Sequence, residues 1–326
     1  MENRDLERRV NDAKKLLAEV KQEVGRKIVG QEAMVDGLLM GIIASGHVLV
    51  EGVPGLAKTL AVRTLAEALT IDFKRIQFTP DLLPADLTGT MIYRQQTGEF
   101  VARKGPVFSN IILADEINRA PAKVQAALLE SMAEKQVTIG DNTYKLPNPF
   151  FVLATQNPIE QEGTYQLPEA QLDRFVMKLK INYPTAGEEL EILKRMGSEK
   201  DIAIRSVLNS ITIDQLRRAA ESITVDERIE KYIVSIVTAS RANDQKHLSF
   251  ARYIEYGASP RATIYLYRCA RVKALFEGRT FVLPEDVKGV AYDVLRHRIV
   301  LSYEAQAEEM STDDVIRDIL AAVSVP

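Results

Sequence analysis

The sequence predicts a doubly wound α/β domain with a parallel sheet, followed by a smaller domain built only of helices. The length supports this, since 326 residues correspond to about two domains of ordinary size. Between residues 46 and 182, short apolar segments alternate with helical segments, as in a parallel sheet with crossover helices. After Pro184 only helical periodicity continues.

Composition narrows the class of protein. Hydrophobic residues make up 46% and charged residues 27% of the chain, which is typical of a soluble globular protein. With 42 basic and 45 acidic side chains the formal net charge is −3. No general basic field therefore attracts nucleic acid or anionic lipid, although a local basic patch stays open. The single cysteine, Cys269, excludes a disulfide framework and cysteine-based zinc sites, and the three histidines are too scattered to predict a metal cluster.

Neither targeting nor membrane insertion is expected. The first residues carry acidic side chains and no apolar run, unlike a secretory signal peptide. The most apolar stretch, 38–50, is interrupted by glycine, serine and histidine and is shorter than the ~20 residues that span a bilayer. We therefore expect a cytoplasmic protein.

The predicted sheet has five strands with helices around it. Apolar residues spaced by three or four from Leu6 predict an amphipathic first helix that ends near Gly25, and a second helix follows Gly30. Continuous apolar runs are typical of strands that are buried on both faces of a parallel sheet. The expected strands are 47–51, 73–78, 111–115, 150–155 and 175–181, and helices fit at 59–69 and 122–134.

Two β-hairpins interrupt this alternation. Residues 86–107 contain an apolar segment, a glycine-containing turn at 96–99 and a second apolar segment, which predicts a hairpin inserted after the second sheet strand. Residues 136–146 repeat the pattern around Gly140-Asp141-Asn142, just before the fourth sheet strand. From the residues alone, each hairpin is open to interpretation as a surface decoration.

The second half is expected to be helical, and we place the domain boundary at Pro184, which gives domains 1–183 and 184–326. Two helix starts are marked by capping boxes and one by a proline in the first turn: Thr212 with Gln215, Ser311 with Asp314, and Pro284. Helical segments fit at 186–196, 213–222, 226–241, 260–276, 285–297 and 312–323.

A phosphate-binding loop is predicted at residues 52–59. The segment follows a strand and opens a helix, the context in which backbone N–H groups and a helix N-terminus bind phosphate oxygens. Lys58 would reach the β- and γ-phosphates of a nucleotide, and the Thr59 hydroxyl would ligate Mg²⁺. Ala57 stands where the pattern expects glycine, and alanine fits only if the backbone there is not left-handed. The residues that we assign to nucleotide binding here are Gly52, Val53, Pro54, Gly55, Leu56, Ala57, Lys58, Thr59 and Leu60.

A pair of acidic residues complements this loop. The apolar strand 111–115 ends in Asp115 and is followed by Glu116, at the edge where parallel α/β sheets bind ligands. Asp115 would hold Mg²⁺ through water or the Thr59 hydroxyl, and Glu116 would orient and polarise the attacking water. The alternative is a solvated acidic pair that caps a helix, but the two motifs together favour binding and hydrolysis of a nucleoside triphosphate.

With these motifs the chain resembles the AAA+ ATPases, and within them the MoxR family, whose relatives include the ATPase subunit of magnesium chelatase. The resemblance covers residues 28–300 and rests on long motifs that occur in order. Besides the segment 52–59, they are LADEINRAP at 113–121, LLESM at 128–132, ATQNP at 154–158, GTYQLPEAQLDRF at 163–175 and GASPRA at 257–262. An alanine at position 57 is expected in this family.

The resemblance implies roles for several further residues. Asn157 is similar to the sensor 1 residue that positions the lytic water, and Arg261 to the sensor 2 arginine of the lid, which touches the γ-phosphate in the same subunit. Arg174 looks like the arginine finger that is offered to the neighbouring subunit, with Arg119 as a rival. The segment that resembles the adenine-binding one includes Val29 and Gly30.

The same side chains have ordinary structural interpretations. Without the family, Asn157 is a residue that caps a turn before proline, and Arg261 is a solvated arginine at a helix start. Arg174 is then an ion-pair partner of Asp173 or Glu169.

The resemblance also implies assembly and partners. An arginine finger supplied in trans requires a neighbour at every site, so a homo-oligomeric ring follows, and a hexamer is the family expectation. The hairpins at 86–107 and 136–146 resemble the helix 2 insert and the pre-sensor 1 hairpin, which face the pore or the partner. The implied function is Mg²⁺-dependent ATP hydrolysis that remodels or matures client proteins, or inserts a cofactor or metal into them. Clients with von Willebrand A domains are among those that the family suggests.

Three other functions are weighed against this one. A P-loop small-molecule kinase would need a substrate pocket rather than a helical second domain, and an acceptor instead of water. A nucleotide-gated scaffold would turn ATP over slowly and only switch an interaction surface. A DNA translocase is disfavoured by the net charge of −3, so nucleic acid is not expected as a partner. A local basic ring in a pore would revive it, and the candidates are Arg94, Arg103 and Lys104.

Overall fold

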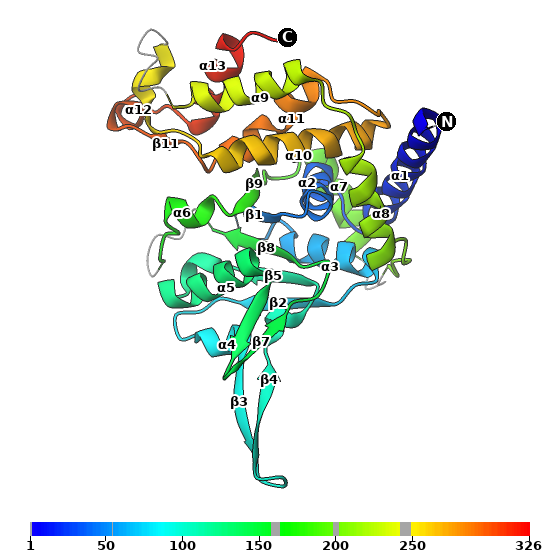
Figure 1. Ribbon diagram of the computed structural model, residues 1–326, viewed down its shortest axis with the longest axis vertical. Helices are drawn as coiled ribbons and strands as arrows, with labels where there is room; N and C mark the ends of the chain where they lie inside the picture. The colour runs from blue at the N-terminus through cyan, green and yellow to red at the C-terminus, as the bar shows by residue number, and fades with distance from the viewer. Residues whose placement is uncertain (1, 54, 158–163, 198–201, 242–248) are drawn as a thin grey trace.

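The computed structural model describes residues 2–53, 55–157, 164–197, 202–241 and 249–326. The molecule is elongated, with helices of the second half at one end, the parallel sheet in the middle and a hairpin that projects from the other end (Figure 1). None of the helices in these ranges is both long enough and apolar enough to cross a membrane.

The described residues form a five-stranded sheet, in which every neighbouring pair of strands is parallel. Its strand order is β2-β5-β8-β1-β9, so β1 lies between β8 and β9, the two strands of this sheet that come last in the sequence. This confirms the predicted doubly wound sheet. The strands are β1 (His47–Glu51), β2 (Phe73–Gln77), β5 (Ile111–Asp115), β8 (Phe151–Gln156) and β9 (Phe175–Lys180).

Alternate residues of the central strands enter two hydrophobic cores on the two faces of the sheet. In β1, Val48 and Val50 belong to one core and Leu49 to the other. The first core also contains the helices α1 (Glu2–Gly25), α2 (Glu32–Ile43) and α3 (Lys58–Leu69) together with helices of the second half. The second core lies under α4 (Pro84–Thr88), α5 (Ala122–Glu134) and the hairpins.

Both predicted hairpins are present. The first is formed by β3 (Gly89–Arg94) and β4 (Glu99–Lys104), and the second by β6 (Gln136–Ile139) and β7 (Asn142–Lys145). They touch at Gly140, which has a φ of +61° and packs under Met91 of the first hairpin. A Cβ on this residue would lie 3.1 Å from the Met91 sulfur, so glycine serves both the turn and the contact.

The second half is mainly helical, as predicted, with one small addition. A two-stranded antiparallel ribbon joins β10 (Ile254–Tyr256) to β11 (Val300–Leu301), and such short strands give no clear pattern in the sequence. The helices are α7 (Ala186–Met196), α8 (Ser210–Glu221), α9 (Glu227–Ala239), α10 (Pro260–Glu277), α11 (Pro284–Leu295), α12 (Tyr303–Ala307) and α13 (Thr312–Ala322). The remaining short elements are η1 (Pro106–Phe108), η2 (Ile117–Arg119), α6 (Glu169–Leu172) and η4 (Ser249–Tyr253).

One predicted helix start is wrong. The cap of α8 is Asn209, whose Oδ1 accepts a hydrogen bond of 3.0 Å from the Thr212 backbone N–H. Thr212 is therefore the third residue of the helix rather than its cap, because the asparagine provides an equally good acceptor one turn earlier. The box formed by Ser311 and Asp314 and the proline start at Pro284 are confirmed.

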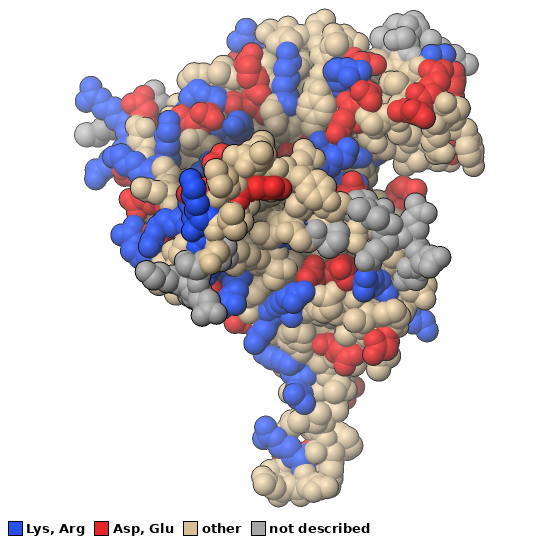
Figure 2. Space-filling view, turned by 180° about the vertical axis from the view of Figure 1, so that it is seen from behind, with Lys and Arg blue, Asp and Glu red and all other residues tan. Residues whose placement is uncertain are grey.

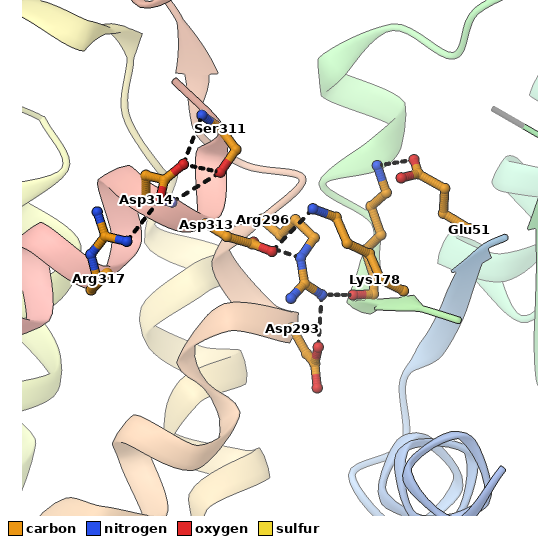
Figure 3. Close-up of polar contacts among 9 residues, drawn as sticks. Glu51, Lys178, Asp293, Arg296, Ser311, Asp313, Asp314 and Arg317 are labelled. Atoms are coloured by element: carbon orange, nitrogen blue, oxygen red, sulfur yellow. Dashed lines mark hydrogen bonds and ion pairs between the residues drawn. The ribbon is translucent and has the colours of Figure 1, made fainter. Parts of the chain in front are cut away.

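The end of α11 docks on the lateral edge of the sheet, along β9. Three successive side chains reach main-chain carbonyl groups of that strand. Arg296 donates to the Lys178 oxygen at 2.7 Å and is held between Asp293 and Asp313 (Figure 3). Arg298 donates to the oxygens of Phe175 and Val176, and His297 also contacts the Phe175 oxygen. The second half of the chain thus covers an edge that would otherwise expose unpaired backbone groups.

Candidate functional site

The phosphate loop and the acidic pair lie at the same end of the sheet, because parallel register aligns the carboxyl ends of the strands. Gln77 of β2 pairs with Asp115 of β5, and Val50 of β1 pairs with Thr155 of β8. The loop leaves β1, the acids follow β5, and β8 separates the two strands. Such a switch in strand order opens a crevice where α/β sheets bind ligands.

A pocket of about 410 Å³ occupies this crevice. Most of its lining was predicted from the sequence, including the acidic pair and the candidate sensor Asn157. Arg75 is an addition that the sequence did not suggest. The lining residues are Gly55, Leu56, Ala57, Lys58, Thr59, Leu60, Arg75, Asp115, Glu116 and Asn157.

The loop turns sharply at two left-handed residues. Gly55 has a φ of +88°, and no atom lies within 4 Å of where its Cβ would be, so the backbone is open to a ligand. Ala57 has a φ of 53° and a ψ of 20°, which contradicts the expectation that an alanine here avoids the left-handed region. This left-handed conformation costs an alanine about 1–2 kcal/mol. Ala57 is the N-cap of α3, and the turn there directs the first N–H groups of that helix toward the pocket. Pro54 lies outside the described residues.

Lys58 is the first residue of α3, and its ammonium group is directed back at the loop. The Nζ atom donates to the Gly52 carbonyl at 2.5 Å. Partial burial lowers the pKa of Lys58, and attraction to Asp115 and Glu116 opposes this decrease. The ammonium group is thus held between the loop and the acidic pair, at one wall of the pocket.

Asp115 is buried at the end of β5, with both carboxylate oxygens in use. Its Oδ1 accepts from the Thr155 hydroxyl at 2.7 Å, and its Oδ2 accepts from Arg75 at 2.7 and 3.0 Å. Thr155 in turn accepts the Glu116 backbone N–H at 2.8 Å. These contacts fix the carboxylate of Asp115 toward the pocket and align the residue that follows it.

Glu116 is also strained and held by side chains. It has a φ of 56° and a ψ of 51°, a left-handed conformation that is uncommon for glutamate and frequent at functional sites. Its Oε2 accepts from Gln77 at 2.8 Å and pairs with Arg119 at 3.1 Å. Both partners are side chains, so the carboxylate can be released without breaking the sheet.

The residues present fit a magnesium ion. The Thr59 hydroxyl and the Asp115 carboxylate line the same pocket, and hard oxygen donors are the ligands that Mg²⁺ prefers. Within the described ranges there is no cluster of three or more acidic, histidine or cysteine ligands. That suits an ion which usually takes one or two protein ligands and completes its shell with water and substrate phosphates.

Six of the predicted residues that the structure describes are not among the lining residues of this pocket. Arg174 donates to the Leu129 carbonyl at 2.6 Å, and Arg261 pairs with Asp173 at 3.4 Å. Val29 and Gly30 precede α2, and Gly30 is packed against the Glu188 side chain. Of the predicted loop residues, Gly52 and Val53 contribute a carbonyl group and a core contact.

Comparison with known proteins decides the family. Residues 47–177 match the "ATPase family associated with various cellular activities (AAA)", and residues 248–319 match the AAA lid domain. Chaperone MoxR1 of Mycobacterium tuberculosis is 50% identical over 305 residues, which cover 93% of this chain and 81% of the relative. Protein MoxR of Methylorubrum extorquens is 30% identical over 97% of both chains.

The chain belongs to the MoxR family of AAA+ ATPases. The fold agrees with this membership, because a crystal structure of a protein from Cytophaga hutchinsonii matches with a TM-score of 0.93. That protein is 53% identical, and the match covers 100% of this chain and 99% of the other. The MoxR resemblance inferred from the motifs, and the AAA+ fold with a lid, are therefore confirmed.

Proposed function

We propose that this MoxR family member binds Mg²⁺–ATP in the pocket at the carboxyl end of the sheet and hydrolyses it. The observation that carries the proposal is the convergence of Lys58, Asp115 and Glu116 on one pocket of about 410 Å³. A cation for the phosphates, a hard ligand for the metal and a carboxylate for water are the parts that such hydrolysis needs. A kinase transfers the phosphoryl group to an acceptor, so it would not need a carboxylate that is directed at water beside its metal ligand.

Each part has an assigned task. The residues of the segment 52–60 other than Pro54, which has no N–H group, hold the phosphates through their backbone N–H groups. Lys58 exchanges its contact with the Gly52 carbonyl for one with a phosphate oxygen. Thr59 and Asp115 hold Mg²⁺, which neutralises charge on the phosphates when bound. Glu116 turns from Gln77 and Arg119 to a water molecule, and Asn157 positions that water.

We further propose that the chain has two domains, 1–183 and 184–326, and works as a hexameric ring. The location of Arg174 supports this, since it does not line the pocket of its own chain and is held on the Leu129 carbonyl. An arginine in such a place is suited to the nucleotide of a neighbouring subunit, where it stabilises charge in the transition state. Arg119 is the weaker candidate, because it is paired with Glu116.

The proposed output is remodelling or maturation of client proteins, or insertion of a cofactor or metal into them, including clients with von Willebrand A domains. Support comes from the relative named as a chaperone and from the projecting hairpin. Tyr93 and Phe100 pack against each other across this hairpin, with 56% and 67% of their surface exposed. The tip is mainly uncharged, and Lys and Arg side chains gather above it (Figure 2).

The test is calorimetry with Mg²⁺–ATP together with phosphate release. Wild-type protein should bind Mg²⁺–ATP and release phosphate without an acceptor, whereas Lys58→Ala should lose binding. Absence of binding in the wild type would refute the proposal. Binding with very slow turnover that a partner does not accelerate would favour the scaffold instead.

Mixing of variants tests the ring. Arg174→Ala subunits keep an intact pocket, and Lys58→Ala subunits still supply Arg174. Mixed rings should therefore recover part of the activity that each variant lacks alone. Failure of rescue at every mixing ratio, with rescue of Arg119→Ala instead, would transfer the role of finger to Arg119.

A further inference from the structure

The backbone of Glu116 is held on both sides. This residue lines the pocket and has the left-handed φ of 56°. On the strand side, its N–H donates to the Thr155 hydroxyl at 2.8 Å. On the other side, its carbonyl oxygen accepts the Arg119 N–H at 2.9 Å in the short turn η2. A strained residue keeps such a conformation only where its surroundings fix it, so the contacts of η2 help to decide where the Glu116 carboxylate lies.

The side chain that fixes η2 is Gln125, in the first turn of α5. It is completely buried, and its Nε2 atom lies 3.2 Å from the Ile117 carbonyl oxygen and 3.1 Å from that of Ala120. These two carbonyl groups lie at the start of η2 and directly after its end. The same nitrogen lies 3.0 Å from the Tyr165 carbonyl oxygen. Because all three partners are acceptors, the nitrogen and not the oxygen of the amide must face them.

A second segment is joined to the same turn through Tyr165. Its N–H donates to the Asn118 carbonyl at 2.6 Å, while its own carbonyl group accepts from Gln125. Tyr165 belongs to the connection between β8 and α6, whereas η2 directly follows β5 and Glu116. Gln125 therefore joins the two segments that leave β5 and β8 at the carboxyl end of the sheet, although it is not itself among the residues that line the pocket.

We propose that Gln125 is a positioning residue, which holds the turn after Glu116 so that the Glu116 carboxylate is directed into the pocket. This inference rests on the proposed function, because it assumes that Glu116 polarises the attacking water. Without the amide, η2 is free to relax and Glu116 can leave its strained conformation. A displacement of about 1 Å is enough to slow a reaction by about 10²-fold. ATP binding depends on the loop 52–60 and should not change.

The experiment compares Gln125→Met with the wild type in single-turnover phosphate release and in calorimetry of Mg²⁺–ATP binding. Methionine has nearly the same length but donates no hydrogen bond. We expect phosphate release to slow by about 10- to 10²-fold, with the affinity for ATP within about twofold of the wild type. An unchanged rate in a folded variant overturns the inference, and so does an equal loss of rate and affinity.

A double variant shows whether Gln125 acts through Glu116. In Glu116→Gln the carboxylate is already absent, so adding Gln125→Met should leave the residual rate as it is, measured in long incubations with radiolabelled ATP. A merely structural role would lower the rate by the same factor in both backgrounds. That result would also overturn the inference.

A matched control is available on the same helix. Ser131 is also buried, and its hydroxyl donates to the Ala127 carbonyl at 2.8 Å, within α5. Ser131→Ala therefore removes a buried hydrogen bond without releasing η2, and its rate of phosphate release should match that of the wild type. If it slows release as much as Gln125→Met does, the effect is general damage to α5 and the inference is wrong.

Folding of each variant is checked by chemical denaturation. If Gln125→Met does not fold, Gln125→Asn takes its place, since it keeps an amide that is one methylene shorter and no longer reaches all three carbonyl groups. Its rate should fall while its affinity for ATP is retained, and a wild-type rate in folded Gln125→Asn overturns the inference. A wild-type protein that binds no ATP, or releases no phosphate from it, would instead refute the proposed function.

Discussion

The carboxyl end of the sheet and its lateral edge at β9 both carry clusters of charge, but their partners differ in kind. At the carboxyl end, Asp115 and Glu116 are paired with the side chains of Arg75 and Gln77 from the neighbouring strand. At the lateral edge, Arg298 is buried and Arg296 is mostly buried, and both donate to main-chain carbonyl groups of β9. A side-chain partner can turn aside for a ligand, whereas a main-chain carbonyl of a packed strand cannot.

This difference indicates which contacts change when a nucleotide binds. Helices α1 and α2 share one hydrophobic core with α8 and α10, and the end of α11 is fixed to β9. Rotation of the second half as a whole would have to break both. The pair between Arg261 and Asp173 is long and its arginine is exposed, so it is the charged contact at this junction that costs least to exchange.

The largest effect should come from Glu116→Gln at the carboxyl end. It removes the charge to which we assign the polarisation of water, so phosphate release should fall about 10²- to 10⁴-fold while Mg²⁺–ATP still binds. The free energy of unfolding should change by less than about 1 kcal/mol, since the lost partners are exchangeable side chains. Phosphate assays, calorimetry and denaturation measure the three quantities. Glu19→Gln, an exposed residue on α1, is the control, and wild-type turnover in Glu116→Gln would contradict the assigned role.

A substitution at the lateral edge should instead have its main effect on stability. Arg298→Met removes one donor from the carbonyl groups of Phe175 and Val176 and from one oxygen of Asp173, and only His297 then remains on the Phe175 oxygen among the described contacts. We expect the free energy of unfolding to fall by about 3–5 kcal/mol in chemical denaturation. The exposed Arg317, paired with Asp314, provides a control in which methionine should cost less than about 1 kcal/mol. If Arg298→Met and Arg317→Met are equally stable, the contacts at the lateral edge are no more fixed than an exposed ion pair, and the contrast with the carboxyl end is lost.

Acid should lower the stability of the fold through two buried histidines, His47 and His297, neither of which lines the pocket. His47 accepts the Val152 N–H at Nδ1, contacts the Met132 oxygen through Nε2, and burial lowers its pKa to about 4. Burial likewise lowers the pKa of His297, which bonds the Phe175 oxygen at the lateral edge. In the unfolded chain these histidines bind protons near pH 6.5, whereas in the folded chain they stay neutral at that pH. The free energy of unfolding therefore falls as the pH drops from about 6.5 to 4.

For His47 alone this loss reaches about 3 kcal/mol, since each pKa unit corresponds to about 1.4 kcal/mol. His47→Gln keeps a donor and an acceptor but does not titrate, so its stability should depend less on pH across that window. Denaturation at pH 7 and pH 4.5 measures the difference. Identical pH dependence in wild type and variant would show that His47 is not held neutral.

The sequence predicted the features that depend on neighbours along the chain. The loop 52–59, the acidic pair and both hairpins are encoded in continuous segments, so residue spacing was enough to find them. Two local predictions were wrong: the backbone conformation of Ala57, which is left-handed, and the cap of α8, which is Asn209 rather than Thr212. In both places the neighbouring residues allow two local conformations, and the sequence alone does not decide between them.

Features that depend on register between strands were missed. Gln77 meets Glu116 because β2 pairs with β5, and Thr155 meets Asp115 because β8 lies on the other side. Their polar side chains at the carboxyl ends of predicted strands were the available signal. Arg75 is the most consequential omission, because it occupies an oxygen of the proposed metal ligand.

The smallest predicted effect tests that residue. Arg75 is half-exposed and donates to Oδ2 of Asp115, the group that we assign to Mg²⁺, so the guanidinium and the ion compete for one oxygen. In Arg75→Gln, the Mg²⁺ concentration that supports half-maximal ATP binding should fall by less than about fivefold, the strength of an exposed ion pair. Calorimetry at graded Mg²⁺ measures this shift, with Lys74→Gln on the same strand as the unchanged control. A higher Mg²⁺ requirement in Arg75→Gln would mean that Arg75 orients the carboxylate for the metal rather than competing with it, and that the carboxyl end also contains a fixed contact.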